Sequence, residues 1–461
     1  MHALTYIILL CIILLGMNDK VRGNKARGRS GRGWILVAIG LLVVAIGGKW
    51  LFISVAGQVL HPNPQAIPSL THTDPSPEWS GAVDRARLII RAGLAGQNLP
   101  GLSVAVGAGG GIVWAEGFGW ADIETHVPVT PDTRFRIGTA STVLTFAAAG
   151  VLLEKGLLTL DDEIQTYVPQ FPKKQWTVTL RQLMAHVGGV GTDGGDEGPL
   201  FRQRCERPVE ALPHFAHNGL LFEPGTQYRH SKYGWILVSA AVEAAADQPF
   251  LTFLREQIFL PLGMDNTGAE SATEENPERV GEPAEDAPFL TFIRQMILEP
   301  LGIGGTKARP ATDPATVYFP GFGYDPLVRY GLHVMRPHNL SCYAGSMAFF
   351  STPSDLVRFG LAVNGGALLR PATVRLLQTS QQLTSGQETG YGLGWDLDTV
   401  TLAGEPAQAA GHDGELLGRR VVSLRMFHEA GIVVAVMSNI SDADTPALAL
   451  KVAEAFAQPA R

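Results

Sequence analysis

Apolar and polar positions along the chain alternate in patterns that predict a helix followed by a hairpin. Residues 80–97 carry apolar side chains at helical spacing, with polar side chains between them, which predicts an amphipathic first helix. Two apolar runs follow, Pro100–Val106 and Ile112–Trp114, with the glycines Gly109–Gly111 between them. Short apolar runs joined by glycines are typical of a β-hairpin, so we expect two paired strands here.

The rest of the chain divides into a helix-rich part and a strand-rich part. An apolar helix is predicted to end near Lys155-Gly156, within a segment, 138–345, that is rich in predicted helices and loops. Apolar strands are predicted later, at Arg420–Phe427 and Gly431–Met437. Pro446 is expected to open a last helix, because proline is favoured in the first turn of a helix.

Two apolar stretches, 6–17 and 34–60, precede the predicted domain, and the basic segment 20–32 separates them. The second stretch is long enough to span a bilayer, which needs roughly 20 apolar residues, although Lys49 interrupts it. Lys and Arg near a span stay on the cytoplasmic side. We therefore expect 34–60 to be a transmembrane anchor in a bacterial-type inner membrane, with 1–33 inside and the predicted domain on the extracytoplasmic side.

Three questions about this N-terminal region remain open. The stretch 6–17 is marginal for a span, so the chain crosses the membrane once or twice, and Met17 competes with Met1 as the true start. The third alternative is a signal cleaved at Ser54-Val-Ala56, which would release a secreted protein. In each case the Pro-, Ser- and Thr-rich segment 61–79 is predicted to be a linker that leads into the domain.

Charge is distributed unevenly along the 461 residues. The formal net charge is −7, and the residues before Leu60 carry seven Lys or Arg against one Asp, which leaves the remainder near −13. A body of that charge argues against nucleic acid as a partner. The three cysteines, Cys11, Cys205 and Cys342, lack the spacing of a metal site. An exported domain permits a Cys205–Cys342 disulfide, and two separate thiols are the alternative.

One segment of the chain is duplicated. Residues 249–267 and 288–306 match at eleven of nineteen positions, at a shift of 39. Both copies begin with Pro-Phe-Leu-Thr-Phe and contain Pro-Leu-Gly. A single duplication does not make a solenoid, because that architecture needs three or more units. We interpret the pair as a local tandem duplication whose role the sequence does not disclose.

Five short motifs follow one another in a specific order. They are Phe135-Arg-Ile-Gly-Thr-Ala-Ser-Thr142, Leu183-Met-Ala-His-Val-Gly-Gly189, Glu223-Pro-Gly225, Tyr391-Gly-Leu-Gly-Trp395 and Gly411-His-Asp-Gly414. Together they resemble the β-lactamase-related serine hydrolases, which include class C β-lactamases, D-Ala-D-Ala carboxypeptidases and related esterases. The resemblance implies an α+β domain over 80–458, in which N- and C-terminal helices flank an antiparallel sheet and a helical region is inserted. It implies no metal and no cofactor.

The first catalytic motif of that family is altered in this chain. The family's helix opens with Ser-x-x-Lys, in which the serine is the nucleophile and the lysine activates it. The matching positions are Thr139 and Thr142, and Ser-x-x-Lys occurs nowhere in the chain. Thr139 keeps a hydroxyl, whereas Thr142 offers no base, because an alcohol does not accept a proton near neutrality. Ser141 is rotated by about 100° from the nucleophile's face and is expected to be an ordinary helix serine.

The second motif, Tyr-x-Asn or Tyr-x-Ser in the family, is altered as well. Its tyrosine matches His230 and its last position matches Lys232, while Tyr228 and Tyr233 are expected to pack in the core. One interpretation is that His230 or Lys232 supplies the missing base, giving a Thr139/His230 pair. The other is drift after activity was lost, since three changes in two motifs are difficult to compensate.

The third motif is retained. His412, Asp413 and Gly414 match the family's Lys/His-x-Gly on the strand that edges the pocket. The resemblance implies that His412 meets a substrate carboxylate, that Asp413 and Gly414 contact substrate, and that strand N–H groups help to form an oxyanion hole. His186, in the second of the five motifs, is expected to fix a loop rather than to act as a catalyst.

These motifs leave two functions open. The first is a membrane-anchored hydrolase of esters, β-lactams or D-amino-acid peptides that acts through an acyl-enzyme at Thr139. The second is a pseudoenzyme that binds a peptidoglycan-like or acyl ligand, or a protein, without turnover. The substitutions at Thr142 and His230 favour weak or lost activity. Neither the substrate nor the oligomeric state is predicted.

Overall fold

The computed structural model describes residues 59–192, 199–269, 314–320, 332–335, 339–416 and 418–457. The predicted segment 1–33, most of the predicted anchor 34–60 and the second copy 288–306 therefore lie outside the described residues. Among the helices in the described ranges, none is both long enough and apolar enough to cross a membrane.

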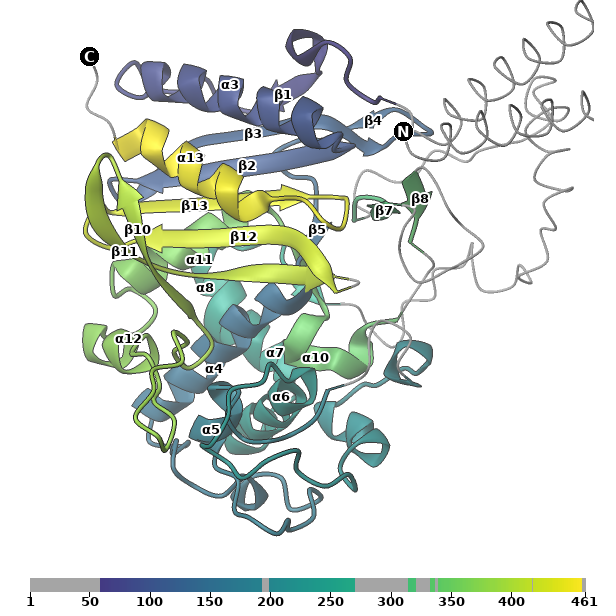
Figure 1. The fold of residues 1–461 in the computed structure, drawn as a ribbon, viewed down its shortest axis with the longest axis vertical. Helices are drawn as coiled ribbons and strands as arrows, with labels where there is room; N and C mark the ends of the chain where they lie inside the picture. Colours follow the sequence, from purple (N-terminus) through teal and green to yellow (C-terminus); the bar gives the residue numbers. More distant parts are fainter. Residues whose placement is uncertain are drawn as a thin grey trace, which may run out of the picture. The chain divides into compact units, whose positions relative to one another are not determined.

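An antiparallel sheet dominates the fold (Figure 1). Its strand order is β1 (Ser69–Thr71), β3 (Gly111–Asp122), β2 (Gly101–Ala108), β13 (Ile432–Ser438), β12 (Arg419–Phe427), β11 (Glu405–Leu416) and β10 (Asp396–Leu402), with β4 (Val127–Pro128) paired to β3. The strands from the two ends of the chain meet where β2 pairs with β13. The centre of the sheet thus joins a strand from near the start of the domain to one from near its end.

The predicted hairpin and C-terminal strands are confirmed. Strands β2 and β3 pair in antiparallel register around Gly109 and Gly110, whose φ angles of 60° and 85° lie in the left-handed region. Glycine adopts this region without steric cost, which explains the turn. Part of the predicted linker 61–79 is also structured, because β1 pairs with β3. That part of the segment packs on the domain instead of spanning a gap.

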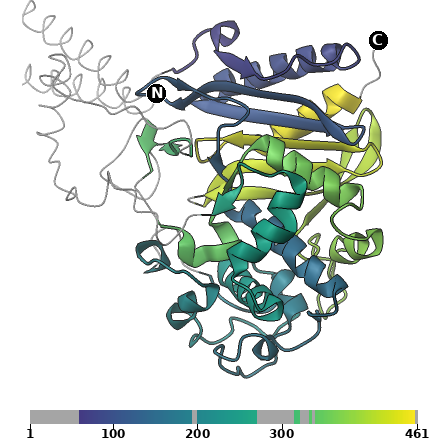
Figure 2. The ribbon, with the colours of Figure 1, turned by 180° about the vertical axis from the view of Figure 1, so that it is seen from behind.

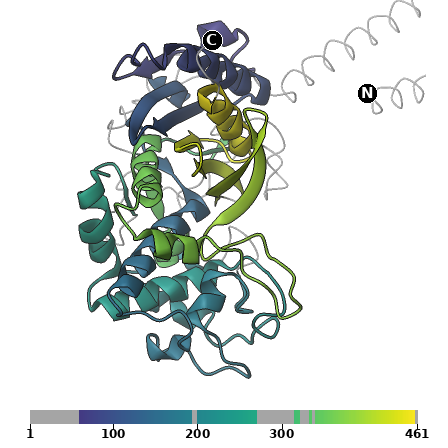
Figure 3. The same cartoon turned by 90° about the vertical axis from the view of Figure 1, so that its left-hand side faces the viewer.

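Two helices cover one face of the sheet, α3 (Ser80–Gln97) and α13 (Thr445–Ala457), and they lie side by side (Figures 1 and 3). These are the predicted first and last helices, with Pro446 in the first turn of α13. Their apolar side chains form one core with the facing strands, including Leu94, Val104 and Val452. The predicted pair of flanking helices is confirmed.

The other face of the sheet carries α11 (Pro353–Asn364) and, below it, the helical region (Figure 2). That region contains α4 (Thr142–Glu154), α5 (Leu180–Met184), α6 (Lys232–Ala246), α7 (Phe250–Leu254), α8 (Leu260–Leu262), α10 (Ala344–Met347), α12 (Pro371–Leu377) and a π-helical turn, Arg255–Phe259. Helix α4 is buried on nearly all sides, which explains its uniformly apolar sequence. It packs against α6, α7, α10 and α12.

Short elements connect these layers. The 3₁₀ turns are η1 (Pro64–Ala66), η2 (Gly138–Ser141), η3 (Ile164–Thr166), η4 (Pro199–Arg202), η5 (Pro208–His214) and η8 (Ser341–Tyr343). A small sheet is formed by β5 (Phe135–Arg136), β9 (Phe349–Ser351) and β6 (Gly268–Ala269), and a second one by β7 (Tyr318–Pro320) and β8 (Leu332–Val334). Cys205 and Cys342 form a disulfide, which resolves the alternative between a bridge and two thiols.

Candidate active site

Thr139 lies on the turn η2, directly against strand β11. Its hydroxyl accepts a hydrogen bond from the Glu415 N–H at 2.9 Å and donates to the Asp413 carbonyl oxygen at 3.3 Å. The residue is therefore on a 3₁₀ turn that precedes α4, not inside an α-helix. The Thr139 hydroxyl thus both donates to and accepts from main-chain groups of β11.

Two glycines allow the turn and the strand to approach so closely. A Cβ added to Gly138 would lie 2.1 Å from the Glu415 carbonyl oxygen, and Gly138 has a φ of +52°. A Cβ added to Gly414 would lie 2.1 Å from the Ile137 carbonyl oxygen. Strand β11 also changes register between Gly414 and Glu415, and such bulges redirect a strand edge. Gly414 thus shapes the site through its lack of a side chain.

Thr142, at the lysine position, contacts the main chain of Thr139 and faces the Tyr391 hydroxyl. Its hydroxyl is buried and donates to the Thr139 carbonyl oxygen at 2.9 Å. Ser141 is turned elsewhere: its hydroxyl donates to the Gly138 carbonyl oxygen at 2.7 Å and accepts from the Phe349 N–H at 3.2 Å. The expectation that Ser141 is structural is confirmed, and neither residue offers Thr139 a base.

Three histidines and two tyrosines gather beside this turn. The rings of His186 and His230 are 4.4 Å apart, and those of His186 and Tyr391 are 5.0 Å apart. Tyr228 lies 5.8 Å from Tyr391, and His412 lies 6.2 Å from it, edge to face. These residues come from four separate parts of the chain, so the fold, not local sequence, brings them together.

Burial keeps two of these histidines neutral. Burial first, and then the neighbouring His230 and His412, hold the pKa of His186 well below its ordinary value. Burial, His412 and the Lys232 ammonium lower the pKa of His230 to about 4, although Asp396 opposes this shift. In the described part of the chain no hydrogen bond joins His230 to Thr139. The Thr139/His230 pair therefore stays a prediction, in which His230 would be a weak base.

His186 fixes its loop, as the sequence predicts. Its Nδ1 lies 3.0 Å from the Ser231 nitrogen, and its Nε2 lies 3.2 Å from Trp235 Nε1. Both partners are donors, so the neutral ring accepts from one of them at a time. Ser231 caps α6 through the Gly234 N–H, which places Lys232 in the first turn of that helix. Lys232 is partly exposed and acts on His230 through its charge.

His412 presents an unused nitrogen to this group. Its Nδ1 lies 2.8 Å from the Asp413 carbonyl oxygen, which requires the hydrogen to be on Nδ1 and leaves a lone pair on Nε2. His412 is 4% exposed, and its Nε2 has no hydrogen-bond partner in the described residues. The Tyr391 hydroxyl is likewise buried; it faces the Thr142 side chain but makes no hydrogen bond of good geometry in the described residues. Burial raises the pKa of Tyr391 well above its ordinary value, so this phenol stays protonated and can donate.

The carboxylate of Asp413 points away from these groups and is already paired. It accepts from the Ser423 hydroxyl at 2.7 Å and from Arg425 Nη2 at 2.8 Å. Ser423 and Arg425 thus hold the side chain of Asp413, while its main-chain carbonyl oxygen contacts Thr139; its contact with substrate stays a prediction. The prediction that Tyr228 packs in the core is wrong, because its side chain is 41% exposed. The sequence also did not indicate that Tyr391 belongs to the site, because its motif does not show which residues it contacts.

The neutral histidines give a stability profile that can be measured. The unfolded chain binds a proton on His230 near pH 6.5, whereas the folded protein binds it near pH 4. Between these values the unfolded state carries more protons, so the free energy of unfolding should fall as the pH falls, by up to about 1.4 kcal/mol per pH unit. Urea unfolding at pH 7, 6 and 5 should show that the free energy of unfolding depends less steeply on pH in His230→Gln than in the parent. Equal slopes would contradict the assignment.

Within the described ranges, no group of three or more His, Cys, Asp or Glu side chains is arranged to hold a metal ion. The three histidines of the site are included in that statement.

Comparisons with known proteins agree with this geometry. A family model described as Beta-lactamase matches residues 86–457. The serine beta-lactamase-like protein LACTB, mitochondrial, of Mus musculus is 28% identical over 280 residues, which cover 44% of this chain and 51% of the mouse protein. The chain thus spans about half the length of that relative in the match. Penicillin-binding protein 4* of Bacillus subtilis (strain 168) is 24% identical over 375 residues, covering 77% of this chain and 72% of the relative.

A solved structure shows the same fold. The D-amino acid amidase from Ochrobactrum anthropi SV3, complexed with D-phenylalanine, superimposes with a TM-score of 0.62 at 20% sequence identity. The match covers 82% of this chain and 99% of the amidase chain.

Proposed function

This chain belongs to the β-lactamase family, and we propose that it is a member that binds an acyl or D-amino-acid ligand with weak or no acyl transfer. The observation that carries the proposal is the state of the Thr139 hydroxyl, which is held between the Glu415 N–H and the Asp413 carbonyl oxygen. The Thr139 hydroxyl thereby engages the Glu415 N–H, a strand group that a substrate carbonyl would need as a hydrogen-bond donor.

The first argument concerns the oxyanion. In acyl transfer, preorganised N–H groups must stabilise the developing negative charge on the carbonyl oxygen. The Glu415 N–H is the strand group closest to Thr139, and the Thr139 hydroxyl itself accepts its hydrogen bond. A substrate would have to displace that contact before it could react.

The second argument concerns the base. A positioned general base typically contributes about 10²–10⁴-fold to the rate. Thr142 donates its hydrogen bond to a carbonyl oxygen and cannot take a proton from Thr139. His230 is lowered in pKa to about 4, so it would accept a proton only reluctantly. Both features favour slow or absent turnover.

The unpaired polar atoms favour a bound ligand. Buried polar groups in folded proteins are nearly always hydrogen-bonded, so an orphaned atom calls for a water or ligand partner. His412 Nε2 and the Tyr391 hydroxyl are an acceptor and a donor of that kind. A ligand with a carboxyl, amide or hydroxyl group would satisfy both. The D-phenylalanine named in the amidase complex is one molecule of this chemistry, and it suggests D-amino acids and their acyl derivatives as the first ligands to test.

A slow histidine-dependent acyl hydrolase is the second candidate. It is favoured by the lone pair on His412 Nε2, which lies next to Tyr391 and on the same strand as the Thr139 contacts. In that case His412 would be the base and a hydroxyl near it the nucleophile.

We further propose that the domain is exported and held by the anchor predicted at 34–60. The Cys205–Cys342 disulfide supports this, because disulfides persist in oxidising compartments and are rare in the cytosol. Alkylation of free thiols in intact cells, before lysis, tests it. The two cysteines should be protected, and their alkylation would count against export.

The main experiment is intact-mass spectrometry after incubation with a fluorophosphonate or a penicillin. We expect no adduct at Thr139, and an esterase turnover at least about 10²-fold below the ordinary value of about 10 per second. Thr139→Val, which keeps the shape and removes the hydroxyl, is the matched control and should leave any residual rate unchanged. A covalent adduct at Thr139, or a turnover near ordinary values, would overturn the proposal. N-acetyl-D-phenylalanine should nevertheless shift the ring resonances of His412.

A further inference from the structure

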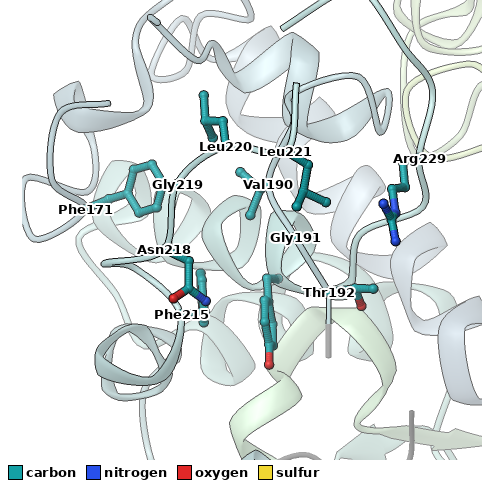
Figure 4. A pocket seen from close by; sticks show the side chains of 11 residues that line it. Phe171, Val190, Gly191, Thr192, Phe215, Asn218, Gly219, Leu220, Leu221 and Arg229 are labelled. Carbon is teal, nitrogen blue, oxygen red and sulfur yellow. The ribbon is translucent and has the colours of Figure 1, made fainter. Parts of the chain in front are cut away.

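A cavity of about 380 Å³ lies in the helical region, apart from the site described above (Figure 4). It is formed where the loop 190–192, the loop 215–221 and the start of α6 meet, and Phe171 also lines it. None of the catalytic-motif positions lines it. Its volume falls within the range typical of small-molecule sites, about 300–1,000 Å³.

The floor of the cavity is aromatic. Phe171, Val190, Phe215 and Tyr233 line it and are all buried. The rings of Phe215 and Tyr233 are stacked, with centroids 4.3 Å apart and planes within 10°. Flat aromatic walls favour a ligand with a flat apolar body, because stacked rings gain contact area over their whole face.

The rim of the cavity carries an available cation. Arg229 is exposed, and in the described part of the chain its guanidinium makes no hydrogen bond or ion pair. Its own N–H donates to the His186 carbonyl oxygen at 2.9 Å, so the main chain from which the side chain extends is fixed. In Figure 4, Arg229 lies on one side of Val190 and Leu221, and Asn218 lies on the other.

A second positive charge lies behind the opposite rim. Lys174 Nζ donates to the carbonyl oxygens of Ala216 and, at 2.7 Å, of Asn218. It thereby holds the loop that carries Asn218, whose exposed amide can donate to a ligand. A planar guanidinium and an amide at the mouth of an apolar cavity suit a carboxylate, which guanidinium binds in a bidentate, charge-assisted manner.

We propose that this cavity binds a small aryl carboxylate, with its ring on Phe215 and Tyr233 and its carboxylate on Arg229. This site is independent of the proposed function at Thr139. It is nevertheless connected to that site, because Arg229 directly precedes His230 and the Ser231 hydroxyl donates to the Gly191 carbonyl oxygen of the cavity wall at 2.7 Å. A bound ligand would therefore hold the start of α6 and the loop 190–192 together.

Calorimetric titration of the full chain with 3-phenylpropionate tests the proposal. We expect one molecule to bind per chain, and 3-phenylpropionamide, which lacks the charge, to bind about 10- to 100-fold more weakly. Arg229→Gln should cause the same loss for the acid and none for the amide. Arg375→Gln removes another exposed arginine, outside the cavity, and should change nothing.

Two further measurements keep the result unambiguous. Leu221→Trp places a large side chain at the exposed rim, where Leu221 is 51% exposed and folding is not at risk, and should block binding. Hexanoate should bind more weakly than 3-phenylpropionate if the aromatic floor selects the ring. The proposal would be overturned by acid binding that survives both Arg229→Gln and Leu221→Trp, by an equal loss in Arg375→Gln, or by hexanoate binding as tightly as the aryl acid.

Discussion

Removing the Cys205–Cys342 disulfide is expected to lower the free energy of unfolding by about 5 kcal/mol in the chain-entropy description of a cross-link. The bridge joins residues 137 positions apart, so it excludes a large set of extended conformations from the unfolded chain. It connects the loop before η5 to the turn η8, and both cysteines are buried. A loss of that size is comparable with the whole stability of many domains.

The measurement is urea unfolding of the Cys205→Ala/Cys342→Ala double variant beside the parent, without reductant. The parent in reductant should match the double variant, and the double variant should not respond to reductant. Since both side chains are small and buried, the alanines leave little additional cavity. A difference below about 1 kcal/mol would show that the bridge does not restrict the unfolded chain as described.

Local patterns were sufficient to predict the elements whose signals lie within a few residues. The hairpin around Gly109 and Gly110 required only alternating strands and a glycine turn, and the helix begun at Thr445 required only Pro446 and apolar spacing. The helix over 80–97 was predicted at its observed bounds for the same reason. Such elements depend on propensity and periodicity, which a single sequence displays.

The site could be predicted only in part, because its decisive contacts join distant residues. The resemblance placed Thr139 opposite the strand at His412. It could not show that the Thr139 hydroxyl accepts a hydrogen bond from the Glu415 N–H, 276 positions away. Tyr391 and His412 carry unpaired polar atoms only because the fold buries them together. Nor does spacing alone decide whether two cysteines pair.

Restoring the family residues at four positions is expected to convert an unreactive protein into one that is covalently labelled. The variant combines Thr139→Ser, Thr142→Lys, His230→Tyr and Lys232→Asn. Positions 139 and 142 are three apart on consecutive turns, so a lysine at 142 can reach a hydroxyl at 139. Loss of the threonine methyl group also leaves the hydroxyl freer to rotate away from the Glu415 N–H, which would then be available to a substrate oxygen.

Single changes should achieve little, because residues that act as one unit contribute non-additively. Thr142→Lys alone should even destabilise the fold, since position 142 is buried and an unpaired ammonium there is costly. Asparagine at 232 removes an ammonium that would otherwise repel the new lysine, and tyrosine at 230 restores the hydroxyl that the family carries there. We therefore expect the quadruple variant to fold stably and to react, and each single variant to be unreactive or less stable.

The assay is burst labelling by a chromogenic β-lactam or a short-chain nitrophenyl ester, read by intact mass. The quadruple variant should take up close to one label per chain at position 139, whereas the parent should take up none. The matched control carries Thr139→Ala with the other three changes and should remain unlabelled. A cooperative thermal transition establishes that each variant is folded. A folded quadruple variant that is still unlabelled would show that these four residues are not sufficient for reactivity. The close contact of Gly138 and Gly414 with the opposing main chain, which leaves little room for a substrate at the strand edge, would then be the cause to examine.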